Sequence, residues 1–301
     1  MPDARDRHRP REGRTAGGPR RRRPGPHEGA ALQGGRPHRA HDMAEGAGGR
    51  HRSLGPMKLV DLQGVSLNYG RIQALDEVSF QLEAGETLGL LGENGAGKTT
   101  CLRILAGLLL PDRGRVRISG VDLYPEPQRL ARRLGFMPTG LPPDQRVTET
   151  LDLRARLCGF SGKRRAAEVE RLVTLCQAGD FAHRFNGTLS TGMRQRVALA
   201  WALCGEPDLI LLDEPSFGLD PRQQVTLREI IAAAARKSAV IVSSHGLDEL
   251  ARIAGRFLVL HHGRVLHDGP APGPLLEFFL DLTGTAGESD SLVESTAGGV
   301  S

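Results

Sequence analysis

The stretch that decides the fold is Gly92-Glu93-Asn94-Gly95-Ala96-Gly97-Lys98-Thr99, followed by Thr100. It fits the pattern G-x-x-x-x-G-K-[ST], in which glycines let successive backbone N–H groups point at phosphate oxygens. Lys98 would contribute a positive charge to the β- and γ-phosphates, and the Thr99 hydroxyl would bind Mg²⁺. A tight glycine turn without a ligand would not explain Lys98. We therefore predict that residues 92–100 bind ATP together with Mg²⁺.

The residues on either side of this stretch support the prediction. Residues 87–91 form a short apolar run that is typical of a buried strand. Residues from about 97 to 108 have the pattern of a helix that stops near Pro111. A phosphate-binding loop needs a strand before it and a helix after it, because the helix N-terminus faces the anion.

Further from the loop, the chain predicts an α/β fold. Residues 58–68 and 75–83 alternate apolar and polar side chains, as half-buried antiparallel strands do. The other expected strands are 115–118, 133–137, 209–213, 239–243 and 256–260, and the expected helical ranges are 147–186, the segment after Ser190, 221–236 and 246–254. Strands that alternate with helices predict a mostly parallel sheet with crossover helices.

Two carboxylates end an apolar strand in the sequence Leu209-Ile210-Leu211-Leu212-Asp213-Glu214-Pro215. Carboxylates at the end of a buried strand are costly unless a charged group meets them. Asp213 is predicted to hold Mg²⁺, mostly through water, and Glu214 to polarise the attacking water as general base. An alternative is that these acids only cap the following helix.

His245 follows the strand predicted at 239–243. This strand comes one step after the strand that carries Asp213, so the imidazole could reach a γ-phosphate and distinguish ATP from ADP. A structural histidine is the alternative. Together with Glu214 and Lys98, His245 completes the predicted catalytic set.

Positive charge is concentrated at the N-terminal end. Residues 1–56 contain 13 Arg and 6 acidic residues, whereas the other 245 residues contain 27 basic and 29 acidic ones. The first segment is rich in Arg, Gly and Pro, so we expect it to be disordered, or to lie upstream of a natural start at Met57. The nearly neutral remainder predicts no binding of nucleic acid. We expect the main domain at 57–281 and a frayed tail at 282–301.

Cysteine usage and hydropathy bear on the location of the protein. The four cysteines form no CxxC pair, and we expect reduced thiols in the cytosol. No stretch approaches the roughly 18 apolar residues of a membrane-spanning helix. If the protein works at a membrane, the spanning part is expected to be another chain.

A further motif relates the chain to a known family. Leu189-Ser190-Thr191-Gly192-Met193 lies upstream of Asp213 and opens a helix. It resembles the LSGGQ signature of ABC ATPases. With the phosphate loop, the Asp-Glu strand, Gly218-Leu219-Asp220 and Ser244-His245, the resemblance covers about residues 58–270. It implies a P-loop NTPase core of the RecA type, a small antiparallel β subdomain and an inserted helical subdomain at about 140–190.

The resemblance also implies a mechanism. Two subunits would dimerise head to tail, with Ser190, Thr191 and Gly192 of one subunit facing the ATP bound by the other. Asp220 would lie at this interface and link the two sites. Tyr69 matches the family's aromatic residue that stacks on adenine, although a surface tyrosine at a strand end is the alternative. ATP hydrolysis would then move a separate transmembrane permease from the cytoplasmic face of the membrane.

The sequence departs from the family pattern at two places. Thr139 stands where the family usually has a Gln that reaches the metal and the membrane partner, and threonine is too short to span that distance directly. Thr191 and Met193 replace the usual Gly and Gln of the signature. Ser190 and Gly192 are retained, so we expect an active ATPase.

Among the alternatives, an ABC-2 type exporter subunit fits best. The chain has a single nucleotide domain, and its sequence Phe136-Met137-Pro138-Thr139-Gly140-Leu141-Pro142 resembles that of ABC-2 exporter ATPases. The phosphate loop and the signature motif, which would form the two halves of each shared site, both retain their key residues. A homodimer is therefore favoured over a heterodimer. A soluble ABC ATPase of a cytosolic assembly system shares the same nucleotide motifs and stays open as the alternative. Tandem-domain ABC proteins that bind nucleic acid and P-loop kinases are disfavoured, because the chain has one phosphate loop and a signature motif that kinases do not use.

Overall fold

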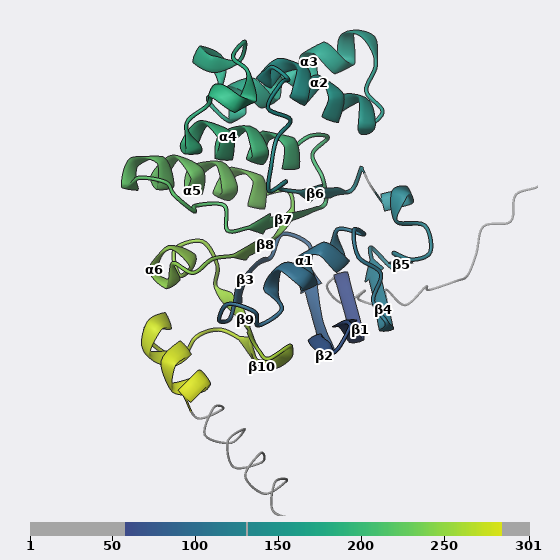
Figure 1. Ribbon diagram of the computed structural model, residues 1–301, viewed down its shortest axis with the longest axis vertical. Coiled ribbons are helices and arrows are strands. Elements are labelled where there is room, and N and C mark those ends of the chain that lie inside the picture. The colour runs from purple at the N-terminus through teal and green to yellow at the C-terminus, as the bar shows by residue number, and fades with distance from the viewer. Residues whose placement is uncertain (1–57, 131, 285–301) are drawn as a thin grey trace, which may run out of the picture. The chain divides into compact units, whose positions relative to one another are not determined.

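Two β-sheets organise the computed structural model, which describes residues 58–130 and 132–284 (Figure 1). The expectations for residues 1–57, and for 285–301 of the predicted tail, concern positions outside the described residues. The predicted tail begins too early, because residues 275–284 are helical and therefore include 282–284.

The smaller sheet is antiparallel, with the strand order β2-β1-β4-β5. Its strands are β1 (Lys58–Tyr69), β2 (Ile72–Glu83), β4 (Arg113–Ile118) and β5 (Val121–Asp122). The predicted antiparallel pairing of the first two strands is confirmed. β2 begins three residues earlier than predicted, because only two residues separate Tyr69 from its partner Ile72.

The larger sheet has the order β10-β9-β3-β8-β7-β6. Its strands are β3 (Thr87–Leu91), β6 (Leu134–Phe136), β7 (Leu209–Asp213), β8 (Ala239–Ser243), β9 (Arg256–His261) and β10 (Arg264–Gly269). All neighbouring strands pair in parallel except β9 and β10, which pair antiparallel. The predicted parallel sheet is thus confirmed, and β3 lies beside β8, which lies beside β7.

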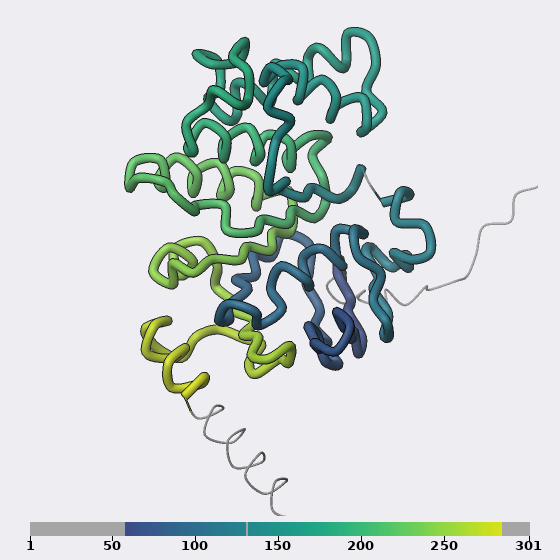
Figure 2. Tube along the Cα trace, in the orientation of Figure 1, coloured from purple at the N-terminus to yellow at the C-terminus, as the bar shows by residue number. Residues whose placement is uncertain are grey.

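Helices connect the strands of the larger sheet, and Figure 2 shows the chain leaving β6, folding into a helical segment and returning to β7. The labelled α-helices are α1 (Lys98–Leu105), α2 (Val147–Leu157), α3 (Gly162–Leu175), α4 (Thr191–Ala202), α5 (Pro221–Ala235) and α6 (Leu247–Leu250), and residues 275–284 form a further helix. Short 3-10 helices are η1 (Pro127–Leu130), η2 (Gly179–Phe181) and η3 (Asn186–Thr188).

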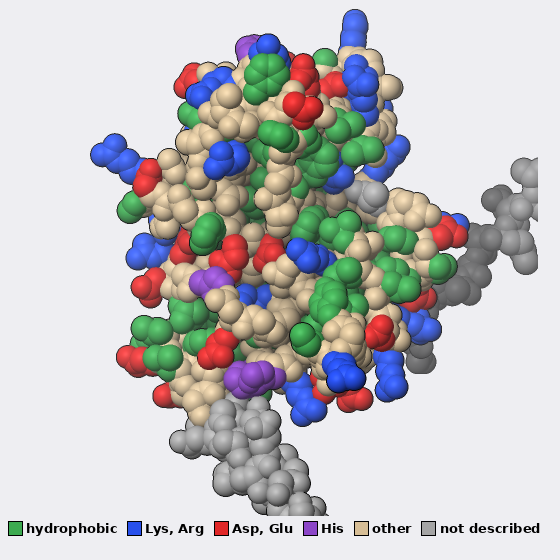
Figure 3. Space-filling view, viewed as in Figure 1, with side chains coloured by type: hydrophobic (Ala, Val, Ile, Leu, Met, Phe, Trp, Pro, Cys, Tyr) green, Lys and Arg blue, Asp and Glu red, His purple; other side chains and the backbone are tan. Residues whose placement is uncertain are grey.

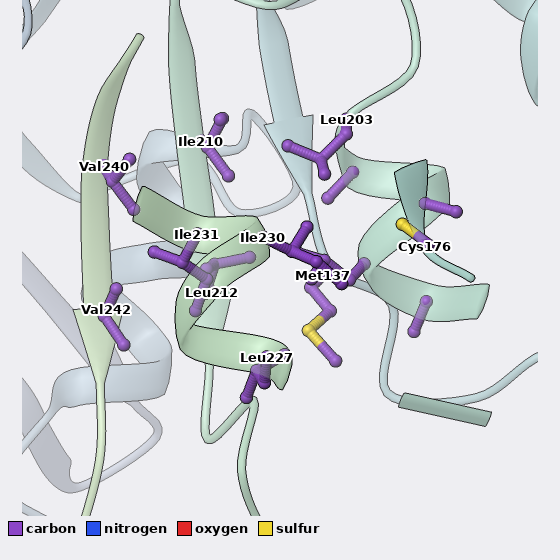
Figure 4. Packing of buried hydrophobic residues seen from close by; sticks show 14 of the residues in the cluster. Met137, Cys176, Leu203, Ile210, Leu212, Leu227, Ile230, Ile231, Val240 and Val242 are labelled. Atoms are coloured by element: carbon purple, nitrogen blue, oxygen red, sulfur yellow. The ribbon is translucent and has the colours of Figure 1, made fainter. Parts of the chain in front are cut away.

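Both faces of the larger sheet are covered, which explains why its strands are apolar throughout. On β7, Leu209 and Leu211 pack in one hydrophobic cluster with α1 and the antiparallel sheet. Ile210 and Leu212 point to the opposite face and pack in a second cluster with α4 and α5. In Figure 4, Leu212 lies beside the α5 residue Ile231, and Ile210 lies further along the same strand.

Helix α1 ends at Leu105, so the predicted end at Leu108 is wrong. Gly107 has a φ of 72°, and its N–H donates to the carbonyl of Ile104 at 3.0 Å. The N–H of Leu108 donates to the carbonyl of Arg103 at 2.9 Å. These two bonds form a Schellman motif, which terminates a helix even where the apolar pattern continues.

The helical range predicted at 147–186 is also interrupted. The chain turns after α2 through Gly159, whose N–H donates to Arg156 O at 2.7 Å, and α3 begins at Gly162. After α3 the chain forms only short 3-10 turns before α4. The helix predicted at 246–254 is likewise reduced to α6, which has four residues.

All four cysteines are free and buried: Cys101, Cys158, Cys176 and Cys204. Burial raises the pKa of Cys101 and of Cys176 to about 12, because a thiolate would lose its hydration. Within 58–130 and 132–284, the helices lack the combination of length and apolar character that a membrane crossing requires.

Candidate functional site

The loop between β3 and α1 closes tightly on neighbouring backbone. Gly97 has a φ of 106°, and a Cβ at this position would lie 2.6 Å from the carbonyl oxygen of Ala74. A Cβ on Gly92 would lie 2.4 Å from the carbonyl oxygen of Leu260. Glycine is therefore needed at both ends of the loop, and these contacts bring it against β2 and β9.

Lys98 is the first residue of α1 and is only 7% exposed. Its Nζ donates hydrogen bonds to the carbonyls of Gly92 at 2.7 Å and Glu93 at 3.0 Å. Burial lowers the pKa of Lys98, and the nearby Glu214 and Asp213 carboxylates oppose this shift. An anion bound in the loop would stabilise the charged ammonium group further, so the side chain is suited to phosphate.

Asp213 and Glu214 lie at the carboxyl end of β7, which is the direct neighbour of β8 in the sheet. The Asp213 Oδ1 accepts a hydrogen bond from the Ser243 hydroxyl at 2.7 Å. Glu214 has a φ of 49°, an uncommon conformation for a residue with a side chain. Its Oε1 is buried and accepts no hydrogen bond from the described residues, so this oxygen retains the capacity to accept from a water molecule or another donor.

His245 lies against Glu214, as expected for residues that follow adjacent strands. The His245 backbone N–H donates to Glu214 Oε2 at 3.1 Å, and the imidazole Nε2 lies 3.3 Å from Oε1. The imidazole is half exposed, so it can also face a ligand.

These groups share a cavity of about 300 Å³. Its lining is Tyr69, Ile72, Ala74, Glu93, Asn94, Gly95, Gly97, Lys98, Thr99, Thr100, Asp213, Glu214 and His245. The structure therefore brings together most of the residues predicted to bind nucleotide, metal and water. Gly92 and Ala96 belong to the loop but do not line the cavity. Figure 3 shows acidic, basic and histidine side chains close together at the middle of one face.

Ile72 and Ala74 are cavity residues that sequence reasoning missed. They lie on β2, and Tyr69 pairs with Ile72 across the turn between β1 and β2. Tyr69 is 46% exposed and Ile72 is 72% exposed. The hairpin register was the signal that could have identified them, because it places apolar side chains beside the tyrosine at the mouth of the cavity.

The residues of the signature motif do not line this cavity. Ser190 caps α4, with its Oγ accepting from Met193 N–H at 3.3 Å. A Cβ on Gly192 would lie 2.3 Å from Gln223 Oε1, so the start of α4 packs on the start of α5. Asp220 caps α5 by accepting from Gln223 N–H at 3.0 Å. Ser190, Thr191, Gly192 and Asp220 thus form a second group, separate from the cavity of the same chain.

Thr139 is exposed just beyond β6 and is not part of the cavity lining. Residues 58–130 and 132–284 contain no group of three or more His, Cys, Asp or Glu side chains that could hold a metal ion. A cation in the cavity would therefore need ligands from a bound molecule in addition to protein side chains.

Comparison with known proteins identifies the family. A model described as ABC transporter matches residues 75–217. The ABC transporter ATP-binding protein NatA of Bacillus subtilis (strain 168) is 38% identical over 202 residues, covering 66% of this chain and 82% of the relative. The chain belongs to the ABC transporter family. This ABC chain is an ATP-binding subunit with the ATPase activity of that family.

Other relatives of the ABC chain agree. The Nod factor export ATP-binding protein I of Burkholderia lata is 35% identical over 225 residues, covering 74% of each chain. The daunorubicin/doxorubicin resistance ATP-binding protein DrrA of Streptomyces peucetius is 36% identical over 217 residues, covering 71% of this chain and 66% of the relative.

Solved structures confirm the fold of the ABC chain. The ATP-binding subunit of an ABC transporter superposes with a TM-score of 0.69 and 29% identity, covering 75% of this chain and 99% of that one. A dimeric post-hydrolysis state of the ATP-binding cassette MJ0796 bound to ADP and Pi gives a TM-score of 0.66 and 27% identity, covering 71% and 99%. The predicted P-loop NTPase fold is therefore confirmed.

Proposed function

We propose that this ABC chain energises an exporter from the cytoplasmic face of a membrane. It binds ATP with Mg²⁺ in the 300 Å³ cavity, pairs with a second copy and drives a separate membrane-spanning permease. The convergence of the phosphate loop, Lys98, Asp213, Glu214 and His245 on one cavity carries the nucleotide part of the proposal. Relatives named for Nod factor export and for daunorubicin/doxorubicin resistance support the exporter part.

Phosphate binding falls to the loop and Lys98. The N–H groups of the first turn of α1 are suited to donate to phosphate oxygens, because a helix N-terminus leaves such groups without internal partners. In the loop itself, the Ala96 N–H donates to the Glu93 carbonyl at 3.2 Å and holds the turn in shape. The Lys98 ammonium group, now bound to two carbonyls, would exchange these contacts for the β- and γ-phosphates.

The donor set of the cavity suits Mg²⁺. Thr99 offers a hydroxyl and Asp213 a carboxylate at the cavity wall. Mg²⁺ is commonly bound by one or two protein oxygens, with phosphates and water completing the octahedron. This fits the absence of a larger cluster of ligating side chains among the described residues. When bound, the ion neutralises charge on the phosphates.

Glu214 acts as the general base. Its Oε1, which accepts no hydrogen bond from the described residues, accepts a hydrogen bond from a water molecule and takes the proton as the water oxygen attacks the γ-phosphorus. The bond between the γ-phosphorus and the bridging oxygen breaks, and ADP and phosphate leave. His245, which contacts Glu214, donates from its imidazole to a γ-phosphate oxygen.

The second copy completes each site. Because Ser190, Thr191, Gly192 and Asp220 lie outside the cavity of their own chain, we assign them to the ATP bound by the partner. The Ser190 hydroxyl and the α4 N-terminus supply donors for the γ-phosphate. The dimeric state of the related cassette with ADP and Pi supports this assignment.

We expect Tyr69→Ala to weaken ATP binding about tenfold, because stacking of a base on an aromatic ring is worth ~1–3 kcal/mol. Tyr69→Phe keeps the ring and serves as the control. Titration with a fluorescent ATP analogue measures both. Equal affinities for Tyr69→Ala and the unmodified chain would contradict the adenine assignment.

A groove of about 890 Å³ on the helical segment is our candidate for the permease contact. Its floor includes Leu153 of α2 and Val169 and Val173 of α3. The exposed carboxylates of Glu149 and Glu170 lie along it, and Arg156, which pairs with Asp152, also lines it. Hydrophobic side chains gather over these helices in Figure 3. An amphipathic helix with an apolar ridge, and with basic side chains opposite Glu149 and Glu170, is complementary to this groove, so we assign it a cytoplasmic helix of the permease.

We expect Leu153→Asp to abolish co-purification of a multi-spanning protein from gently solubilised membranes, because it places a charge in the apolar floor. Leu157→Asp is the matched control: Leu157 lies on the same helix and is 60% exposed, but it does not line the groove. Mass spectrometry of the captured material is the measurement. Capture of soluble partners alone by the unmodified chain would favour a cytosolic assembly role instead, and equal capture by both variants would exclude the groove.

A further inference from the structure

A buried serine stands behind the two carboxylates of the cavity. Ser243 ends β8 and has no exposed surface. It pairs with Asp213 of β7 on one side and with Leu90 of β3 on the other. Paired residues of neighbouring parallel strands point to the same face of a sheet, so the Ser243 side chain is directed toward the Asp213 carboxylate.

We propose that Ser243 is a positioning residue for ATP hydrolysis, with one hydroxyl that fixes both the Asp213 carboxylate and the backbone of Glu214. This inference rests on the proposed roles of Asp213 and Glu214. It says that one atom, the Ser243 Oγ, holds both residues in place.

The contact with Asp213 is short and charge-assisted. The Ser243 Oγ donates to Asp213 Oδ1 at 2.7 Å. Within the part of the chain that the structure describes, no other side chain donates a hydrogen bond to this carboxylate. A hydroxyl has one hydrogen to donate, so the bond to Asp213 uses it completely. The other carboxylate oxygen of Asp213 then remains available to a metal or to its water.

The same hydroxyl holds the next residue. Its oxygen accepts from the Glu214 N–H at 3.0 Å, and the Ser243 carbonyl also accepts from that N–H at 3.2 Å. Glu214 needs such support, because its φ of 49° lies in a region that residues with a Cβ rarely adopt. This conformation directs the Glu214 side chain back to His245, whose N–H binds Oε2.

Ser243 does not line the cavity, so it would not contact a bound nucleotide directly. It acts through Asp213 and Glu214, as residues behind a metal ligand commonly do; replacing such residues typically costs about 10- to 100-fold in metal affinity or activity.

The chain offers a matched control in Ser238, just before β8. It is 5% exposed, and its hydroxyl donates to the carbonyl of Pro207 at 2.6 Å. Ser243→Ala and Ser238→Ala therefore each remove one buried serine hydrogen bond beside β8, but at opposite ends of the strand. A general loss of stability would affect both variants.

Three measurements test the proposal on the full chain. We expect Ser243→Ala to lower kcat about 10- to 100-fold and to raise the Mg²⁺ concentration for half-maximal turnover about tenfold. Mn²⁺ binding in the presence of ATP, followed by electron paramagnetic resonance, should weaken by a similar factor. ATP affinity in EDTA should be unchanged, because the phosphate loop and Lys98 are intact. Ser238→Ala should match the unmodified chain in all three.

Ser243→Thr and Ser243→Val have nearly the same side-chain shape, so a comparison of the two isolates the effect of the hydroxyl group. This pair also serves as the test if Ser243→Ala does not fold. Thr should retain the metal dependence and Val should lose it. Unchanged Mn²⁺ affinity and kcat in Ser243→Ala, or equal behaviour of Thr and Val, would overturn the proposal. Asp213→Ala separates failure of the Ser243 proposal from failure of the carboxylate assignment. If both Asp213→Ala and Ser243→Ala keep full activity, the carboxylate assignment is wrong. If only Ser243→Ala keeps full activity, the carboxylate assignment stands and the role of Ser243 is wrong.

Discussion

Lys98→Ala should reduce ATP turnover by at least ~100-fold, the scale of loss when one preorganised donor to a developing anion is removed. Lys98 is 7% exposed and its ammonium group is bound to two loop carbonyls, so the substitution removes a positive charge that is held in place at the phosphate site. Steady-state phosphate release measures the loss. ATP should also cease to stabilise the variant against heat, because a ligand stabilises only the folded protein that binds it.

Lys58→Ala is the control for this experiment, because Lys58 is exposed at the start of β1, away from the cavity. Thermal melts of both variants without nucleotide verify that they fold. Normal turnover in Lys98→Ala would refute the assignment of the loop as the phosphate site.

Glu214→Gln should lower kcat by ~10²–10⁴-fold, the usual contribution of a general base, while ATP still binds. The substitution retains the size of the side chain and removes the proton acceptor, so the cycle should stop before hydrolysis. ATP-bound dimers should then accumulate, and size-exclusion chromatography with light scattering detects them.

Glu229→Gln removes an exposed carboxylate of α5 that does not line the cavity, and serves as the control. A Glu214→Gln chain that stays monomeric with saturating ATP would count against sites shared between two copies. A variant that hydrolyses ATP at the normal rate would remove Glu214 from the mechanism.

The sequence predicted the central strands to the residue and the helix ends poorly. β3, β7 and β8 begin and end where expected, because runs that are apolar on both faces stop abruptly at a glycine or a polar residue. The end of α1 depends instead on the backbone of Gly107, within a sequence that stays apolar to Leu110. β10 was missed because its side chains are exposed or half-buried, as at a sheet edge, and show no clear alternation.

The site divides in the same way. The residues of the phosphate loop, the end of β7 and His245 could be predicted because their chemistry is local to short motifs, and parallel strands place their ends together. Ile72 and Ala74 could not, because their place at the cavity follows from a hairpin register. The position of Ser190 and Gly192 away from the cavity was expected from the family resemblance alone, because it is a property of the tertiary fold that no local pattern encodes.

The burial of all four thiols leaves the described surface without reactive sulfur. A cysteine introduced at an exposed position, such as Leu157 of α2, would therefore take a maleimide or spin label selectively, with the native cysteines left in place. A second label on the exposed side of β1 would allow the distance between the helical segment and the antiparallel sheet to be followed. The distance distribution with and without ATP would then report how far the two parts move during one turnover.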